Sequence, residues 1–222
     1  MKEKNVKINH LSLQKELFLK HDYKTAIDDL LIVKNKYKRN IFHYNLGTLY
    51  GKKGELAASR YHLEKALKYG TLEGKILHNL NVVKTKMNLQ DLSVSKSMYD
   101  KALDFALIIP SAYYSIISII LLLFVLLGVK KKIIVHNYLR WILIISCLAP
   151  ILVNLFYLDS INHGIVLNDT RTYVGPSRIF QEKEILKAGS KVIVGKPSNG
   201  WFFIKHPNFL AGWVKKSDLA LY

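Results

Sequence analysis

The sequence predicts a multidomain chain with three parts: an N-terminal all-α repeat solenoid, two transmembrane α-helices and a small all-β barrel at the C-terminal end. Three observations support this prediction. A short pattern returns after 34 residues near the N-terminus, two long runs in the middle carry no charged side chain, and short β-rich runs separated by turns follow from Gly164 onward. The 222 residues suffice for one or two domains besides the spans.

The repeated unit is clearest between His43 and Gly70. The stretch "HYNLGTLYGKKGEL" predicts a helix that ends at Gly54, because a glycine after a periodic run commonly ends a helix. A second amphipathic run follows from Leu56 to Tyr69 and ends at Gly70. Two helices joined by a tight turn therefore account for the 34-residue period.

Packing between these two helices is predicted at a few positions. Leu46 and Tyr50 are i, i+4 neighbours on one helix face, and Gly47 lets the second helix approach closely. The second helix offers a small, a bulky and a small side chain at Ser59, Leu63 and Ala66. The period and the pattern His43-x2-Leu46-Gly47-x2-Tyr50 resemble the tetratricopeptide repeat, with a histidine where tryptophan is usual.

Further units flank this one. The stretch "HDYKTAIDDLLIV" contains the second helix of an earlier unit, whose first helix is expected at residues 8–20, and a third first helix is expected from Gly74 to Met87. Residues 1–88 are therefore predicted to form about 2.5 repeats. Repeat arrays need a cap at their end, so residues 89–104 are interpreted as that cap or as a helix lying on the membrane.

The resemblance to tetratricopeptide domains implies a concave groove lined by the first helices. Asn45, Lys75 and Asn79 fall where peptide-binding members of that family hold carboxylates; asparagine can hold an extended peptide backbone, and lysine can pair with an acidic group. A general protein-docking surface and a purely packing role are the alternatives. The groove-facing candidates are Tyr44, Asn45, Thr48, Lys52, Lys75, His78, Asn79, Val82 and Lys86.

Two membrane crossings are predicted in the middle of the chain. No side chain from Phe105 to Val129 is charged, and these 25 residues exceed the ~20 that span a hydrocarbon core. A second uncharged run covers residues 141–158. The loop at 130–140 carries three lysines and an arginine, so the positive-inside rule predicts that it lies in the cytoplasm and that both terminal domains lie on the far side.

The N-terminal segment conflicts with that topology. Residues 1–20 contain no continuous apolar segment of the kind that a secretory signal has. Three explanations stay open: the true start lies upstream, the domain crosses the membrane by another route, or the topology is inverted.

Residues 164–222 are predicted to form a small barrel, because turn residues recur at regular intervals between short β-rich runs. The "SNG" at residues 198–200 predicts a hairpin turn. The motifs Gly175-Pro176-Ser177, Leu186-x2-Gly189-x2-Val192-x-Val194, Gly200-Trp201 and Gly212-Trp213-Val214 resemble a bacterial SH3-type domain. Trp201, Phe203 and Trp213 are candidates for a ligand-binding aromatic strip; the alternative is that so small a barrel needs these rings in or against its core.

No catalytic, metal or cofactor site is predicted. The single cysteine excludes an intrachain disulfide, the eight histidines show no metal-binding spacing, and no phosphate-binding loop or nucleophile motif occurs. The net charge of +17 favours anionic surfaces such as lipid headgroups, but no Arg-rich run or nucleic-acid motif is present. The chain is therefore expected to be neither an enzyme nor a nucleic-acid-binding protein.

The order of repeat units, two spans with a basic loop and an SH3-type domain, with "LHNLNVVKTKM" closing the repeats, resembles the BatE proteins of bacterial aerotolerance operons. The resemblance implies a protein of the bacterial cytoplasmic membrane with both soluble domains in the periplasm. It also implies partner proteins from the same operon, which encodes von Willebrand-type membrane proteins and a MoxR-family ATPase. The expected role is a non-enzymatic scaffold in stress tolerance; the alternatives are an envelope sensor that binds peptidoglycan or a peptide, and an adaptor facing the cytoplasm.

Overall fold

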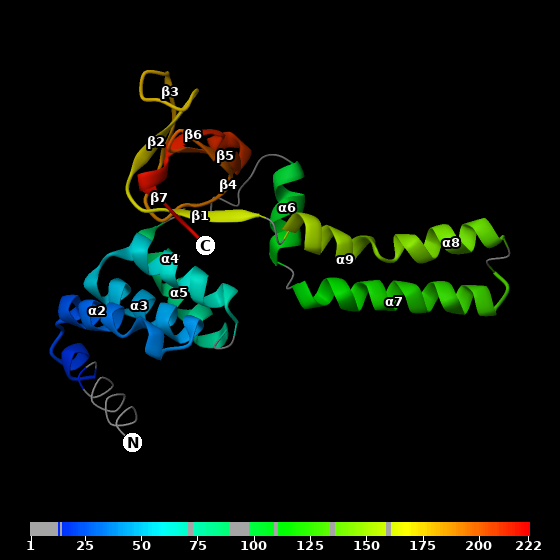
Figure 1. Cartoon of the computed structure of the whole chain (residues 1–222), viewed down its shortest axis with the longest axis horizontal. Coiled ribbons are helices and arrows are strands. Elements are labelled where there is room, and N and C mark those ends of the chain that lie inside the picture. The colour runs from blue at the N-terminus through cyan, green and yellow to red at the C-terminus, as the bar shows by residue number, and fades with distance from the viewer. Residues whose placement is uncertain are drawn as a thin grey trace. The chain divides into compact units, whose positions relative to one another are not determined.

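The computed structural model describes residues 13, 15–70, 73–88, 98–108, 111–133, 136–158 and 161–222. These residues form two compact units (Figure 1). One unit combines the N-terminal helices with the C-terminal sheet, and the other contains the apolar helices of residues 93–161. Residues 8–12 and 14 of the helix predicted at 8–20 lie outside the described residues, as do residues 89–97 of the segment predicted as a cap at 89–104.

The N-terminal helices follow one another through short connections and pack side by side (Figure 1). Gly54 follows the end of α3 with a φ of 93°, in the left-handed region that glycine adopts without strain, and Gly70 follows α4 with a φ of 73°. Both predicted helix ends are confirmed. The elements are α2 (Tyr23–Ile32), η1 (Lys34–Lys36), α3 (Arg39–Lys53), α4 (Leu56–Lys68) and α5 (Glu73–Met87).

Buried side chains at helical spacing hold these helices together. One cluster, which includes Leu30, Phe42 and Leu46, joins α2 to α3. A second cluster joins α4 to α5 and consists of Leu63, Ala66, Ile76, Leu80 and Val83. Full burial of a leucine side chain contributes roughly 2 kcal/mol. The predicted packing positions Leu46, Ser59, Leu63 and Ala66 all have 0% of their surface exposed.

Within the described residues, seven strands form one antiparallel sheet that curves around a single apolar core (Figure 1). Their order across the sheet is β3-β2-β6-β5-β4-β1-β7. The strands are β1 (Asn162–Val166), β2 (Thr170–Tyr173), β3 (Glu182–Leu186), β4 (Lys191–Ser198), β5 (Trp201–His206), β6 (Gly212–Lys215) and β7 (Leu219–Leu221). Short 3-10 turns, η3 (Asn208–Leu210) and η4 (Lys216–Asp218), precede β6 and β7.

Side chains that alternate along the strands fill the core of the sheet. Phe202, Ile204 and Val214 point inward and are almost fully buried. The predicted hairpin turn is confirmed, because Asn199 and Gly200 both have positive φ, 48° and 80°, between β4 and β5. Successive residues Val192, Ile193 and Val194 of β4 are all buried, so both faces of this strand are covered.

The second unit contains helices whose lengths and hydropathy suit a membrane. Within the described part of the chain, two such stretches occur, Ala112–Lys130 with 19 residues and Asn137–Leu158 with 22. The second stretch is built from consecutive short elements. The helices are α6 (Met98–Ile108), α7 (Ser111–Lys130), α8 (Asn137–Ser146), α9 (Ala149–Val153) and the π-helical η2 (Asn154–Leu158).

The helix boundaries differ from the predicted spans. Residues 105–108 of the first uncharged run belong to α6, and α7 begins only at Ser111. Residues 109 and 110, between the two helices, lie outside the described residues. In the second stretch, α8 ends at Ser146 and Pro150 lies in the first turn of α9, where its missing N–H breaks no helical hydrogen bond.

Candidate functional site

A groove of about 220 Å³ lies along the N-terminal helices. Helices α3 and α5 form its two sides, and three residues of α4 form its floor. The lining residues are Gly47, Thr48, Gly51 and Lys52 from α3, Leu56, Ser59 and Leu63 from α4, and His78, Asn79, Val82, Val83 and Lys86 from α5.

Glycines on α3 bring that helix close to α4 at the floor of the groove. A Cβ at Gly47 would lie 2.7 Å from Cγ of Leu63, and a Cβ at Gly51 would lie 2.9 Å from Oγ of Ser59. Ser59 Oγ in turn donates a 2.6 Å hydrogen bond to the carbonyl of Gly47. The close approach predicted for Gly47 is therefore present, and Gly51 extends it by one helical turn.

A line of hydrogen bonds crosses the groove between α5 and α3. Asn79 Nδ2 donates to Thr48 Oγ1 at 3.2 Å, and Thr48 Oγ1 donates to the carbonyl of Tyr44 at 2.9 Å. Both polar side chains are half-buried. Because the Thr48 bond fixes the direction of its hydroxyl proton, the Asn79 amide is held in one orientation, with its carbonyl oxygen available as an acceptor.

The groove is positively charged and has an apolar floor. Lys52 and Lys86 lie on opposite sides, and none of the described residues that line the groove is Asp or Glu. The ammonium group of Lys52 also lies 5.9 Å from the ring centre of Phe18. Leu56 and Val82 supply apolar surface. Such a lining suits a segment that carries both carboxylates and apolar side chains.

The structure brings together only part of the predicted set. Thr48, Lys52, His78, Asn79, Val82 and Lys86 line the groove. The side chain of Tyr44 packs against the buried cluster between α4 and α5. Its backbone carbonyl, and not its ring, takes part in the hydrogen bonds across the groove, as the acceptor from Thr48. Asn45 is half-buried and Lys75 is exposed, and neither lines the groove.

Sequence reasoning missed the floor of the groove. Leu56, Ser59 and Leu63 come from a second helix, where the sequence shows only core-forming periodicity. Gly51 and Val83 were missed as well. The spacing of Gly47 and Gly51, four residues apart on one helix face, is the signal that could have indicated this close approach.

A second candidate surface lies on the outer face of the sheet. Trp201, Phe203 and Trp213 alternate with core residues and are half-buried, so they lie outside the apolar core. Phe203 and Trp213 form an edge-to-face pair with ring centres 5.5 Å apart. Tyr173, which sequence reasoning missed, lies opposite Trp213 in the register of β2 and β6 and packs edge-on against Trp201 at 5.5 Å.

Two histidines meet between α3 and α4. Nδ1 of His43 and Nδ1 of His62 are 2.9 Å apart, and Tyr69 and Tyr50 stack on the outer sides of the two rings. Burial, together with Lys65, lowers the pKa of His43 to about 4, and burial and His43 lower that of His62 to about 3. One ring must therefore accept the proton that the other donates.

This pair packs α3 against α4. Among the residues that the structure describes, no group of three or more His, Cys, Asp or Glu side chains is arranged to hold a metal ion. The stacked rings instead continue the contact between α3 and α4 outside the apolar clusters.

Two surfaces therefore present chemistry suited to binding, the charged groove and the aromatic face of the sheet. In the groove, the hydroxyls of Ser59 and Thr48 each donate to a carbonyl of α3. Comparison with protein-family profiles, with curated protein sequences and with solved structures found no match for this chain.

Proposed function

We propose that this protein is a membrane-anchored scaffold that docks a partner protein in the groove between α3 and α5. The observation that carries the proposal is the groove itself, because it combines two lysines, an oriented asparagine and an apolar floor without a compensating acid among its described lining residues. A site of this composition suits recognition of a segment that carries both acidic and apolar side chains.

The proposed ligand is an extended acidic segment of the partner. Lys52 and Lys86 on opposite sides can pair with two carboxylates of such a segment. The Asn79 carbonyl oxygen can accept a hydrogen bond from a backbone N–H of the segment, while Leu56 and Val82 pack against an apolar side chain. Electrostatic attraction of this kind raises the association rate and makes binding sensitive to salt.

The anchor in this proposal is the pair of membrane-length helices. Their length and hydropathy suit a bilayer, and Lys130 at the end of α7 is followed by a turn that carries Lys131 and Lys132. In the proposed topology this turn faces the cytoplasm and both terminal domains lie in the periplasm. The order of repeat-like helices, spans and a small β-barrel resembles that of BatE-type proteins, so we propose that the scaffold acts in an oxidative stress-tolerance complex with von Willebrand-type membrane proteins as partners.

Charge reversal in the groove tests the proposal. The double variant Lys52→Glu/Lys86→Glu is compared with the wild-type chain in pull-downs from native membranes, with bound proteins quantified by mass spectrometry. We expect the partner to be reduced on the order of tenfold, because two attractive contacts become repulsive. Lys75→Glu is the matched control, since Lys75 is exposed on α5 outside the groove. Equal recovery of the same partner with all three proteins would refute the groove as the docking site.

The aromatic face of the sheet supports a second candidate function, an envelope sensor that binds a peptidoglycan fragment. Half-buried aromatic rings on three neighbouring strands offer apolar surface to a sugar or peptide. Adding peptidoglycan fragments to the full-length protein should then change its tryptophan fluorescence, and Trp213→Leu should abolish the change. A fluorescence spectrum that stays the same at saturating fragment would rule this candidate out.

A further inference from the structure

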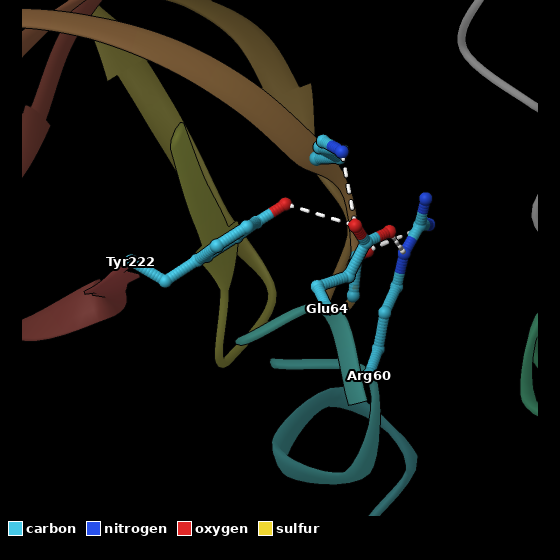
Figure 2. A network of polar contacts seen from close by, with 5 residues as sticks. Arg60, Glu64 and Tyr222 are labelled. Carbon is cyan, nitrogen blue, oxygen red and sulfur yellow. Dashed lines mark hydrogen bonds and ion pairs between the residues drawn. The ribbon is translucent and has the colours of Figure 1, made fainter. Parts of the chain in front are cut away.

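Helix α4 has a second face that contacts the C-terminal sheet. Leu56, Ser59 and Leu63 line the groove, whereas Arg60 and Glu64 point toward the strands (Figure 2). Both charged residues are almost fully buried, with 5% and 7% of their surface exposed. Charged side chains are rarely buried to this extent unless they are paired.

Glu64 pairs with residues of the sheet. Its Oε2 accepts hydrogen bonds from Lys191 Nζ on β4 at 3.0 Å and from the Tyr222 hydroxyl at 3.1 Å (Figure 2). Arg60 Nη1 donates a 2.9 Å hydrogen bond to the carbonyl of Gly189, and its Nε lies 3.8 Å from Glu64 Oε1. We call this set of five residues the Glu64 interface.

Aromatic and apolar side chains surround the Glu64 interface. The ring of His163 stacks on Tyr222 with centres 5.7 Å apart, and Tyr61 of α4 meets Tyr222 edge-on at 6.3 Å. Ile165 and Ile193 are buried although they alternate with the residues that fill the sheet core. Helix α4 contacts β1, on which Ile165 lies, so this outer face of the sheet is covered rather than open to solvent.

The Glu64 carboxylate balances the positive charges of both Arg60 and Lys191 in the Glu64 interface. Burial opposes ionisation of Glu64, yet Lys191 and Arg60 hold the pKa of that carboxyl below its usual value. Burial and the nearby carboxylate raise the pKa of the Tyr222 hydroxyl, which keeps its proton as a donor. Among the described residues of this interface Glu64 is the one acid, so without it Arg60 and Lys191 would face each other uncompensated.

We propose that the sheet is a permanent intramolecular partner of α4, joined to it by Glu64, so that the N-terminal helices and the C-terminal sheet fold as one cooperative body. In the sequence, the membrane-length helices are then an insertion within a single folded body and not a linker between two independent domains. This inference does not depend on what the groove binds.

The contact constrains the topology. Residues on α4 and on β4 can meet only if the chain returns to the side of the membrane from which it left, which requires an even number of crossings. The groove side of α4 remains open in this arrangement, because its lining residues are different from those of the Glu64 interface. The body therefore offers the groove while the sheet covers another face of the same helix.

Hydrogen exchange of the full-length protein in detergent micelles tests the docking. Lys191→Met, a change in the sheet, should speed exchange of amides at residues 60–68 of α4 on the order of tenfold, because it removes a cation from buried Glu64. Lys196→Met on the same strand is the matched control, since Lys196 is exposed. Glu64→Gln, a change in α4, should likewise speed amide exchange on β4. Amides of α2 and α3 should stay protected if the N-terminal helices remain folded. Unchanged exchange of α4 in Lys191→Met would overturn the proposal.

Labelling tests the topological consequence separately. In a Cys147→Ser background, Lys75→Cys on α5, outside the groove, and Lys215→Cys on β6 should react with a membrane-impermeant maleimide from the same side of intact membranes, whereas Lys131→Cys should react from the other side. Labelling of positions 75 and 215 from opposite sides would exclude the shared body. This result is independent of any partner, so failure of the groove proposal would not affect it.

Discussion

Gly47 lies where α3 closely approaches α4, and its replacement by alanine tests how tightly these two helices pack. The added Cβ would lie 2.7 Å from Cγ and 2.9 Å from Cδ2 of Leu63, and 3.1 Å from the backbone nitrogen of Leu63. Leu63 has no exposed surface, so its side chain cannot turn away into solvent.

The expected change is the difference between two effects. Overpacking of this kind costs about 1–3 kcal/mol, and two contacts below 3.0 Å with a third to backbone place Gly47→Ala in the upper part of that range. Alanine has a helix propensity about 1 kcal/mol better than glycine. We therefore expect a net destabilisation of about 1–2 kcal/mol, equivalent to a fall in Tm of about 3–6 °C for a body of this size.

Urea denaturation of the full-length protein in micelles, followed by far-ultraviolet circular dichroism, measures this change. Gly74→Ala is the matched control, because a Cβ at Gly74 on α5 meets no atom within 4 Å. The control should be neutral or more stable than the wild type, since only the propensity gain applies. If Gly47→Ala matched Gly74→Ala in stability, the close packing of Leu63 against Gly47 would be refuted.

Two further predictions concern local structure and pH. Gly54→Ala should lower the free energy of unfolding by about 1 kcal/mol, because Gly54 has a φ of 93° and open space around it, whereas Gly54→Asn should lower it less; equal effects in chemical denaturation would contradict this. Acidification from pH 7 to pH 5 should destabilise the fold, because folded His43 and His62 have pKa values of about 4 and about 3 while unfolded histidine titrates near 6.5. The stability is fully present above pH 6.5 and is lost as the pH falls toward 4. His62→Gln should reduce this dependence, measured as unfolding midpoints across the pH range.

Local features of the N-terminal helices were predicted correctly from the sequence. The ends of α3 and α4 at Gly54 and Gly70 depend on backbone conformations that glycine adopts within one turn. The buried positions Leu46 and Leu63 follow from the 3.6-residue period of a single helix. Such features can be predicted because their causes lie within a few neighbouring residues.

The groove was predicted only in part. Thr48 and Lys52 lie on one face of α3, and Asn79 and Lys86 lie on one face of α5, so each set follows from spacing along one helix. Asn45 and Lys75 were predicted for the same groove but do not line it. Their exclusion depends on the rotation of each helix about its own axis, which is set by packing against α4 and not by the period alone.

The sequence by itself determined the ends of α3 and α4, the presence of two apolar helices of membrane length and the hairpin turn at Asn199, because each is encoded by short-range patterns. Only the tertiary structure decided which distant residues meet. Tyr173 lies opposite Trp213 through strand register, and Glu64 meets Lys191 and Tyr222 across separations of 127 and 158 residues. A buried charge carries no local signal of its partner, since its pairing depends on the free energy of bringing two folded surfaces together.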